Sequence, residues 1–374
     1  MRIAVLKERA AGESRVAITP ETVKKFIGLG ASVAVEGGAG LGAAITDDAL
    51  REAGAELGSA AATIKDADIV LGVQAPDIAS LAGAKPGAWV AATFDPFRNA
   101  ALVDAYAKAG FEALSMEFMP RITRAQSMDV LSSQSNLAGY KAVLAAANEY
   151  GRAFPMMMTA AGTVQAAKCF VMGVGVAGLQ AIATAKRLGA QVSATDVRSA
   201  TREQIQSLGA KPIFVENVAG IEGEGSGGYA TEMSEEYQKA QAELVSGHIA
   251  KQDIVITTAL IPGRPAPRLI SDAQIASMKP GSVIFDLAVA QGGNVEGSAA
   301  DQVVEKHGVK IVGYSNTAGH LAADASALFA RNLFNFLSAF WDKEAGKPVL
   351  DEEIGNAVRL TQGGKVVNER LAAQ

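Results

Sequence analysis

The chain has 374 residues, of which 49% are hydrophobic and 20% are charged, with 39 glycines and a net charge of −5. This composition is typical of a folded α/β protein, and the slightly acidic balance argues against a nucleic-acid or anionic-membrane partner. The single cysteine excludes a disulfide within the chain, and no apolar run reaches the ~18 residues that would span a bilayer. The first nine residues lack the apolar core of a signal peptide. We therefore expect a soluble protein that meets a membrane only through a partner.

Alternating strands and helices are predicted for residues 1–131. A helix begins near Pro20, where Thr19 offers a capping hydroxyl and the proline suits the first turn. Further helices are predicted at 46–53 and 99–109. Short apolar runs predict strands at 3–6, 32–36, 69–73, 89–93 and 112–116. This order indicates a doubly wound, Rossmann-like unit with a parallel sheet.

Two long apolar helices, at 132–152 and 321–339, are predicted to connect this unit with a second α/β unit. We therefore predict two doubly wound Rossmann-like domains with parallel sheets, separated by a cleft. The N-terminal domain is expected to be discontinuous, with residues 1–131 plus 321–374. The nucleotide-binding domain is expected at residues 132–320. A cleft between two such domains is a usual place for the reactive end of a dinucleotide.

The most specific motif is a Gly-x-Gly-x-x-Gly turn at residues 173–178. A short apolar strand (169–172) precedes the turn, a helical pattern follows it, and the next strand (191–195) ends on Asp196. This series of elements is the one that a dinucleotide-binding fold requires. The alternative is a glycine-rich turn that binds nothing.

Each glycine of the motif has its own role in such a fold. Gly173 allows the tight turn, Gly175 lets backbone N–H groups approach a pyrophosphate, and Gly178 lets the helix pack closely on the strand. The N-terminus of the helix offers partial positive charge to the phosphates. Asp196 is expected to accept hydrogen bonds from the adenosine ribose and to repel a 2′-phosphate, which favours NAD(H). Arg198 is interpreted as facing solvent or backing the adenine.

A glycine-rich segment at 215–230 contains five glycines between a predicted strand (212–215) and a predicted helix (232–249). A loop of this length in a compact domain is usually functional or disordered. One interpretation is a mobile lid in which Tyr229 closes over the cofactor. The other is a flexible surface insertion whose tyrosine contacts nothing.

A second polar segment, at 119–136, lies just before the first connecting helix. Gln126 suits a hydrogen bond to a nicotinamide carboxamide, Asp129 suits a ribose hydroxyl, and Arg121 suits the loop itself or a phosphate. The alternative is an ordinary solvated loop in which a serine at 132 or 133 caps the helix.

The chain has few groups suited to acid–base catalysis. It has three histidines, and His320 is the only one near the predicted cleft. His248 and His307 are interpreted as structural or solvated. No His/Cys cluster has metal-ligand spacing, so no metal is expected. This set suits hydride exchange between two dinucleotides, which transfers no proton at the reacting carbons.

Further motifs resemble those of one protein family. In chain order these are Lys7 to Arg9, Met119 to Tyr140, Phe154 to Thr163, the glycine turn, Gly227 to Ala230, Thr257 to Gly263 and Asp286 to Val289. They resemble the NAD(H)-binding component, the alpha-1 subunit or domain I, of the proton-translocating NAD(P)+ transhydrogenases. That family belongs to a superfamily shared with alanine dehydrogenase.

The resemblance implies residue roles. Arg121, Gln126, Asp129 and Ser132 are expected beside the nicotinamide and its ribose, as the catalytic residues. The cofactor is expected to be NAD(H), with Tyr229 on a loop that closes over it. The residues expected to bind the cofactor are Gly173, Gly175, Val176, Ala177, Gly178, Asp196, Val197, Arg198, Gly228, Tyr229, Ala259, Leu260 and Leu287.

The resemblance also implies partners. We expect a homodimer that lies on the cytoplasmic face of the inner membrane and passes hydride to NADP+. NADP(H) is expected on a partner subunit, and a separate membrane subunit is expected to couple the transfer to proton translocation. No nucleic acid and no direct membrane insertion are expected.

Two alternatives are an alanine- or opine-type amino-acid dehydrogenase and a non-catalytic NAD(H)-binding sensor. Alanine dehydrogenase needs a lysine and a histidine for its substrate. Here Gln74 stands where the lysine belongs, and the strand at 92–96 has no histidine. Arg15 is then interpreted as structural, ion-paired near Glu8 or Glu13. Both departures favour the transhydrogenase component.

Overall fold

The computed structural model describes residues 1–215, 234–261 and 263–372. The chain folds as two compact units. Unit 1 contains Met1–Gln134 and Ala318–Gln374, and unit 2 contains Ser135–Thr317. The changes from one unit to the other thus fall at Gln134 and Thr317, where the sequence predicted 131 and 320. The predicted cofactor contacts Gly228 and Tyr229 lie outside the described residues.

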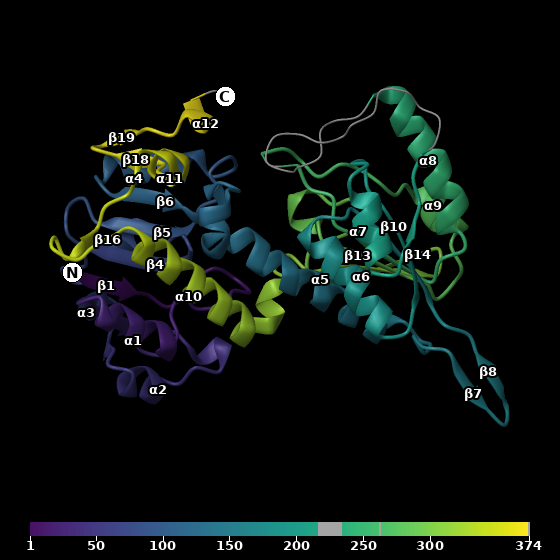
Figure 1. Ribbon diagram of the computed structural model, residues 1–374, viewed down its shortest axis with the longest axis horizontal. Coiled ribbons are helices and arrows are strands. Elements are labelled where there is room, and N and C mark those ends of the chain that lie inside the picture. The colour runs from purple at the N-terminus through teal and green to yellow at the C-terminus, as the bar shows by residue number, and fades with distance from the viewer. Residues whose placement is uncertain (216–233, 262, 373–374) are drawn as a thin grey trace. The chain divides into compact units, whose positions relative to one another are not determined.

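Unit 1 is built on a six-stranded sheet with the order β3-β2-β1-β4-β5-β6, in which all neighbours are parallel (Figure 1). The elements in its first segment are β1 (Arg2–Val5), α1 (Pro20–Gly28), β2 (Ser32–Glu36), α2 (Asp47–Glu52), β3 (Glu56–Gly58), α3 (Ala60–Ile64), β4 (Ile69–Gln74), β5 (Trp89–Thr93), α4 (Ala100–Lys108) and β6 (Glu112–Ser115). The two-residue alternation of a strand accounts for both faces of this sheet. The sequence predicted five of the six strands but neither β3 nor α3.

Helices cover both faces of the unit 1 sheet. Ile3 and Val5 of β1 pack on one face with Phe26 of α1 and Phe329 of α10 (Ala322–Ala339). Ala4 points to the opposite face, into a second core formed with α3 and α4. Figure 1 shows α1 and α10 lying across the same side of this sheet. A helix from the far end of the chain therefore completes the N-terminal domain.

The start of α1 confirms the predicted cap. Thr19 is in the extended region and its hydroxyl accepts a hydrogen bond from the backbone N–H of Thr22, which forms a capping box. The rest of unit 1 after α10 consists of short elements: β16 (Trp341–Asp342), β17 (Lys347–Pro348), α11 (Glu352–Val358), β18 (Thr361–Gln362), β19 (Lys365–Val366) and α12 (Glu369–Ala372).

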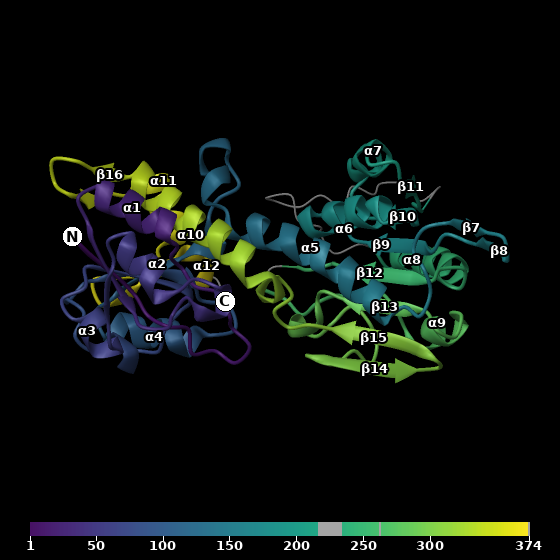
Figure 2. The same ribbon diagram turned by 90° about the horizontal axis from the view of Figure 1, so that it is seen from below.

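Unit 2 contains a seven-stranded sheet with the order β11-β10-β9-β12-β13-β15-β14. Figure 2 shows the strands in this order from β10 to β14. Its elements are β9 (Lys168–Met172), α6 (Val176–Arg187), β10 (Gln191–Thr195), α7 (Thr201–Ser207), β11 (Lys211–Pro212), α8 (Glu235–Ile249), β12 (Ile254–Thr257), α9 (Asp272–Ser277), β13 (Val283–Asp286), β14 (Gln302–Lys306) and β15 (Val309–Gly313). The edge strand β14 is antiparallel to β15, and the other pairs are parallel.

Strand β9 has both of its faces buried. Cys169 and Val171 pack against α6 and against α5 (Val130–Glu149), the first of the two connecting helices. Phe170 and Met172 pack on the opposite face with α8 and α9. Cys169 is fully buried, and burial raises the pKa of its thiol to about 12, so it is a core residue and not a nucleophile.

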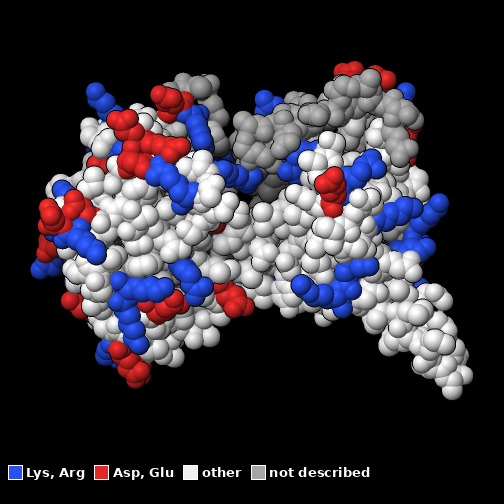
Figure 3. All heavy atoms as spheres, in the orientation of Figure 1, with Lys and Arg blue, Asp and Glu red and all other residues white. Residues whose placement is uncertain are grey.

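Two local predictions were wrong or incomplete. The strand predicted at 212–215 is the two-residue β11, which pairs with Ser193 and Ala194 of β10. A hairpin of β7 (Met157–Thr159) and β8 (Gly162–Val164) was not predicted. It projects from unit 2, and its tip carries no charged side chain in Figure 3. Met156, Met157 and Met158 are exposed there.

Candidate functional site

The glycine turn joins β9 to α6 in unit 2. Gly173 has a φ of +98°, which side chains rarely adopt, so the chain leaves the strand through a residue that needs no Cβ. Gly175 is the N-cap of α6 and makes no side-chain hydrogen bond there. The first N–H groups of the helix, from Val176 and Ala177, have no carbonyl one turn back to accept their hydrogen bonds. They are therefore available to an anion.

The three glycines differ in the space around them. A Cβ on Gly178 would lie 1.9 Å from the carbonyl oxygen of Gly173, so the third glycine is required for packing. A Cβ on Gly173 would lie 2.6 Å from Oγ1 of Thr258. A Cβ on Gly175 would meet no atom within 4 Å. The second glycine thus borders open space beside the helix N-terminus, where the backbone of this fold approaches a pyrophosphate. This geometry fits a dinucleotide.

Asp196 follows β10 and lies beside the turn. It is 6% exposed, and its Oδ2 accepts a hydrogen bond of 2.7 Å from the N–H of Val174. Arg198 donates from its backbone N–H and from Nε to Oδ1, both at 2.9 Å, and from Nη2 to Oδ2 at 2.8 Å. Burial raises the pKa of Asp196, but the hydrogen bonds and charge of Arg198 outweigh burial and hold that pKa below its usual value. Asp196 is therefore ionised.

The arginine pairing corrects one interpretation of Arg198. Its side chain is only 16% exposed and folds onto Asp196, so the solvent-facing alternative is wrong. A carboxylate has about four acceptor positions, and the four N–H groups from Val174 and Arg198 occupy them. A ribose hydroxyl that donates to Asp196 must therefore displace a hydrogen bond from Arg198.

Two further loops of unit 2 are braced by residues that the sequence did not single out as functional. Thr258 donates from Oγ1 to the Gly173 carbonyl at 3.0 Å. Asn294 is fully buried; it accepts from the Ala259 N–H at 3.1 Å and donates to the Ala259 carbonyl at 2.9 Å. Asp286, also fully buried, accepts from the N–H of Asn294. These contacts fix the turns that contain Ala259, Leu260 and Leu287.

The segment that carries the predicted catalytic residues lies in unit 1. Gln126 is exposed on a 3₁₀ helix (η4, Thr123–Met128), and Arg121 is exposed just before it. Asp129 accepts from the N–H of Ser132 at 3.0 Å and from its hydroxyl at 2.5 Å. Asp129 thus provides the cap at the start of α5, where the alternative interpretation expected a serine.

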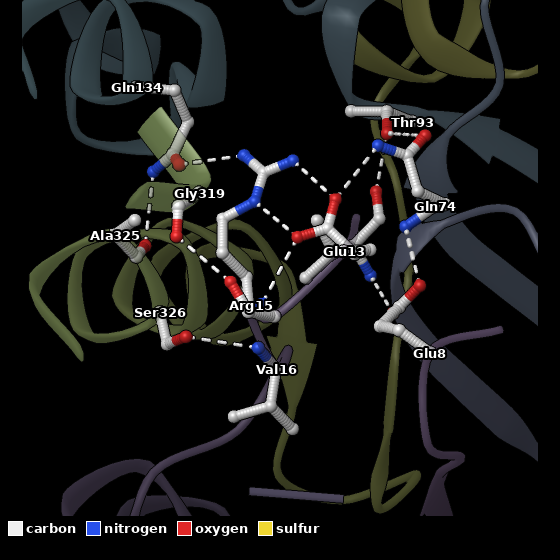
Figure 4. A network of polar contacts seen from close by, with 12 residues as sticks. Glu8, Glu13, Arg15, Val16, Gln74, Thr93, Gln134, Gly319, Ala325 and Ser326 are labelled. Carbon is white, nitrogen blue, oxygen red and sulfur yellow. Dashed lines mark hydrogen bonds and ion pairs between the residues drawn. The ribbon is translucent and has the colours of Figure 1, made fainter. Parts of the chain in front are cut away.

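A buried polar network occupies the carboxyl ends of β1 and β4 in unit 1 (Figure 4). Arg15 donates to Glu13 through Nε at 2.8 Å and Nη2 at 2.7 Å, which confirms the predicted ion pair. Its Nη1 donates to Gln134 at 2.8 Å. Gln74 donates from its amide to Glu13 at 3.2 Å. The place where alanine dehydrogenase needs a lysine therefore holds a neutral amide bonded to an ion pair.

Glu8, beside this network, gives a testable pH dependence. Burial raises its pKa from 4.5 to about 7, although the N–H groups of Val73 and Gln74 donate to it. The folded state therefore binds the proton more tightly than the unfolded state, and stability falls as pH rises from 4.5 towards 7. We expect Glu8→Gln to remove a loss of about 1–3 kcal/mol across that interval. Urea unfolding of both proteins at several pH values measures it, and parallel pH curves would contradict the assignment.

The histidines take ordinary structural positions. His248 lies 2.8 Å from the hydroxyl of Ser193 and stacks edge-on against Phe170. His307 contacts Asp272, and His320 is exposed in the short helix η7 (Ala318–Leu321). Among the residues that the structure describes, no cluster of three His, Cys, Asp or Glu is arranged to hold a metal. Within the same ranges, no helix combines the length and apolar character needed to cross a membrane.

Comparisons with known proteins agree with this geometry. Residues 4–138 match the alanine dehydrogenase/PNT N-terminal domain, and residues 142–369 match the alanine dehydrogenase/PNT C-terminal domain. The first of the polypeptides that make up the NAD(P) transhydrogenase alpha subunit of Rhodospirillum rubrum is 55% identical over 100% of both chains. A crystal structure of transhydrogenase from Sinorhizobium meliloti is 55% identical, with a TM-score of 0.89, over 98% of this chain and 100% of that one.

An alanine dehydrogenase is a more distant relative. The enzyme of Mycobacterium tuberculosis is 31% identical over 80% of this chain and 75% of its own length. Both domain matches and the identity over the full length lead to one conclusion: the chain belongs to the alanine dehydrogenase/PNT family.

Proposed function

We propose that this chain is the NAD(H)-binding component of a proton-translocating NAD(P)+ transhydrogenase. The observation that carries the proposal is the pairing of a dinucleotide turn with a polar network that offers no proton-transferring group. Gly175 leaves space for a pyrophosphate, and Asp196 is ionised for the ribose. Gln74 and Arg15 are both engaged by Glu13. The transhydrogenase relatives, similar over the whole chain, support the same assignment.

The residues of this chain then bind and orient the cofactor, without any proton step. NADH, when bound, supplies the hydride. The turn at Gly173, Gly175 and Gly178 holds the pyrophosphate through backbone N–H groups. Asp196 holds the adenosine ribose and disfavours a 2′-phosphate. Gln126 and Asp129 orient the nicotinamide half, because a small error of position costs much of the rate of hydride transfer.

The acceptor is proposed to arrive on another subunit. NADP+ is held by a partner, and a membrane subunit couples the transfer to proton translocation. We also propose that the chain forms a homodimer. The methionine-bearing hairpin, an apolar surface exposed on unit 2, supports association with a second copy of the chain. Sedimentation equilibrium of the purified protein measures the mass directly, and a monomer at micromolar concentration would contradict the dimer.

One experiment separates the three functional hypotheses. The purified chain is supplied with NADH and NADP+, with and without the NADP(H)-binding component of a transhydrogenase, and NADPH formation is followed. In parallel, the chain alone is assayed with alanine and NAD+. We expect NADPH only when the partner component is present, and no oxidation of alanine. Oxidation of alanine by the chain alone would favour an amino-acid dehydrogenase. Tight binding of NADH without transfer in either assay would favour a sensor.

A further inference from the structure

The loop that carries Gln126 and Asp129 is held by unit 1 from one side. Ala125 and Met128 of η4 are buried in the core beneath it, whereas Gln126 is exposed. Arg124 contributes exposed ion pairs to Asp351 and Glu353. Exposed pairs of this kind contribute little rigidity, so the buried contacts decide where the loop lies.

The buried polar contact to this loop comes from Asn332, in the middle of α10. Asn332 is 8% exposed and lies among fully buried apolar residues of the same helix, such as Leu333 and Phe336. Its Nδ2 donates to the carbonyl oxygen of Ser127 at 2.8 Å, and its Oδ1 accepts from the hydroxyl of Ser133 at 2.7 Å. A buried amide in such a setting is costly unless both of its ends are bonded, and here both ends are.

The two partners of Asn332 bracket the functional residues. Ser127 directly follows Gln126, and Ser133 directly follows Ser132, which bonds to Asp129. One side chain therefore fixes both ends of the segment that is proposed to meet the nicotinamide half.

A second contact extends this arrangement. Gln134 donates to the hydroxyl of Ser133 at 3.4 Å and accepts from Arg15, so the buried network of Figure 4 backs the same hydroxyl. Asn335, one turn further along α10, donates to the same Ser127 carbonyl at 3.0 Å, but it is exposed. Water can replace the Asn335 contact, but it cannot reach the buried position of Asn332 without opening the core.

We propose that Asn332 is a positioning residue for hydride transfer: it holds the Ser127–Ser133 segment in the geometry that presents Gln126 and Asp129 to the nicotinamide. This inference rests on the proposed function for its catalytic consequence. Its structural part, the ordering of the loop, is independent of any cofactor.

The first measurement is amide hydrogen exchange of residues 123–133 in the isolated chain. Asn332→Leu keeps the volume and removes both hydrogen bonds, and Asn332→Asp keeps the acceptor for Ser133 but removes the donor to Ser127. We expect exchange in this segment to accelerate at least tenfold in the leucine variant and less in the aspartate variant. The matched control, Asn335→Ala, is expected to stay within about threefold of wild type, because water replaces its exposed contact.

The second measurement is the rate of hydride transfer with the NADP(H)-binding component present. Asn332→Leu is expected to lower the rate by about 10–100-fold and to change NADH affinity by less than threefold, because orientation matters most at the reacting geometry. Gln126→Ala serves as the reference for a loop defect, and Asn335→Ala as the control with a normal rate. Asn332→Asp is expected to fall between them.

Several outcomes would overturn the inference. These are unchanged loop exchange in Asn332→Leu, an equal effect of Asn335→Ala, or a normal transfer rate in Asn332→Leu. If Asn332→Leu does not fold, the aspartate variant decides by the same criteria. Absence of transfer in the wild-type protein with its partner would instead overturn the proposed function. The exchange result would still test the role of Asn332 in ordering the loop.

Discussion

Gly175→Ala is expected to abolish measurable NADH binding while leaving the fold intact. The residue has a φ of −79°, which alanine adopts freely, and the added Cβ would meet no atom of the protein within 4 Å. Replacing a glycine N-cap by alanine costs the helix well under about 1 kcal/mol. The methyl group would, however, occupy the space through which the backbone approaches the pyrophosphate. Titration of NADH fluorescence, with urea unfolding alongside, measures both effects.

The matched control is Gly178→Ala, where the same methyl group is expected to act on folding. Its Cβ would lie 1.9 Å from the Gly173 carbonyl oxygen, which cannot move without displacing the turn. Overpacking of this kind costs about 1–3 kcal/mol or more of unfolding free energy. The two substitutions thus separate binding from stability. If Gly175→Ala bound NADH as the wild type does, the pyrophosphate would not lie at this turn.

Asp196→Ala is expected to weaken NADH binding and to narrow the preference for NADH over NADPH. Loss of the ribose hydrogen bonds is worth about 1–3 kcal/mol, which corresponds to roughly 5–150-fold in affinity. The substitution also removes the negative charge that repels a 2′-phosphate and leaves the guanidinium of Arg198 without the carboxylate that it contacts. We therefore expect NADPH affinity to rise relative to NADH. Fluorescence titrations with the two nucleotides measure this ratio.

The double variant Asp196→Ala/Arg198→Ala controls for the source of that change. Without the guanidinium, the gain in relative NADPH affinity is expected to disappear, because the 2′-phosphate then has no cation to meet. An unchanged nucleotide ratio in the single variant would remove Asp196 from the ribose site.

The sheets were predictable because their strands are buried apolar runs. The strands at Ser32–Glu36, Trp89–Thr93 and Gln191–Thr195 begin and end where the sequence placed them. Strand β3 has only three residues and none of them is buried, so pairing with β2 defines it and hydrophobic pattern does not. The β7–β8 hairpin is likewise exposed and contributes nothing to a core.

The supporting residues of the candidate site were harder to predict, because their partners are distant in sequence. Asn332 was hidden within an apolar helix pattern, and its partners Ser127 and Ser133 are about 200 residues away. Asn294 lies 35 residues from Ala259, which it braces. The glycine turn, in contrast, needs only neighbours in sequence, so its motif was readable from the start.

The pairing of Arg198 with Asp196 has a kinetic consequence. When a nucleotide leaves, the guanidinium can return to the carboxylate, so departure exposes no bare buried charge and requires no water to solvate it. A carrier that must discard spent NAD+ in every cycle benefits from such an arrangement. Part of the attraction for the sugar is given up in exchange for a shorter residence time, which keeps the protein ready for the next reduced molecule.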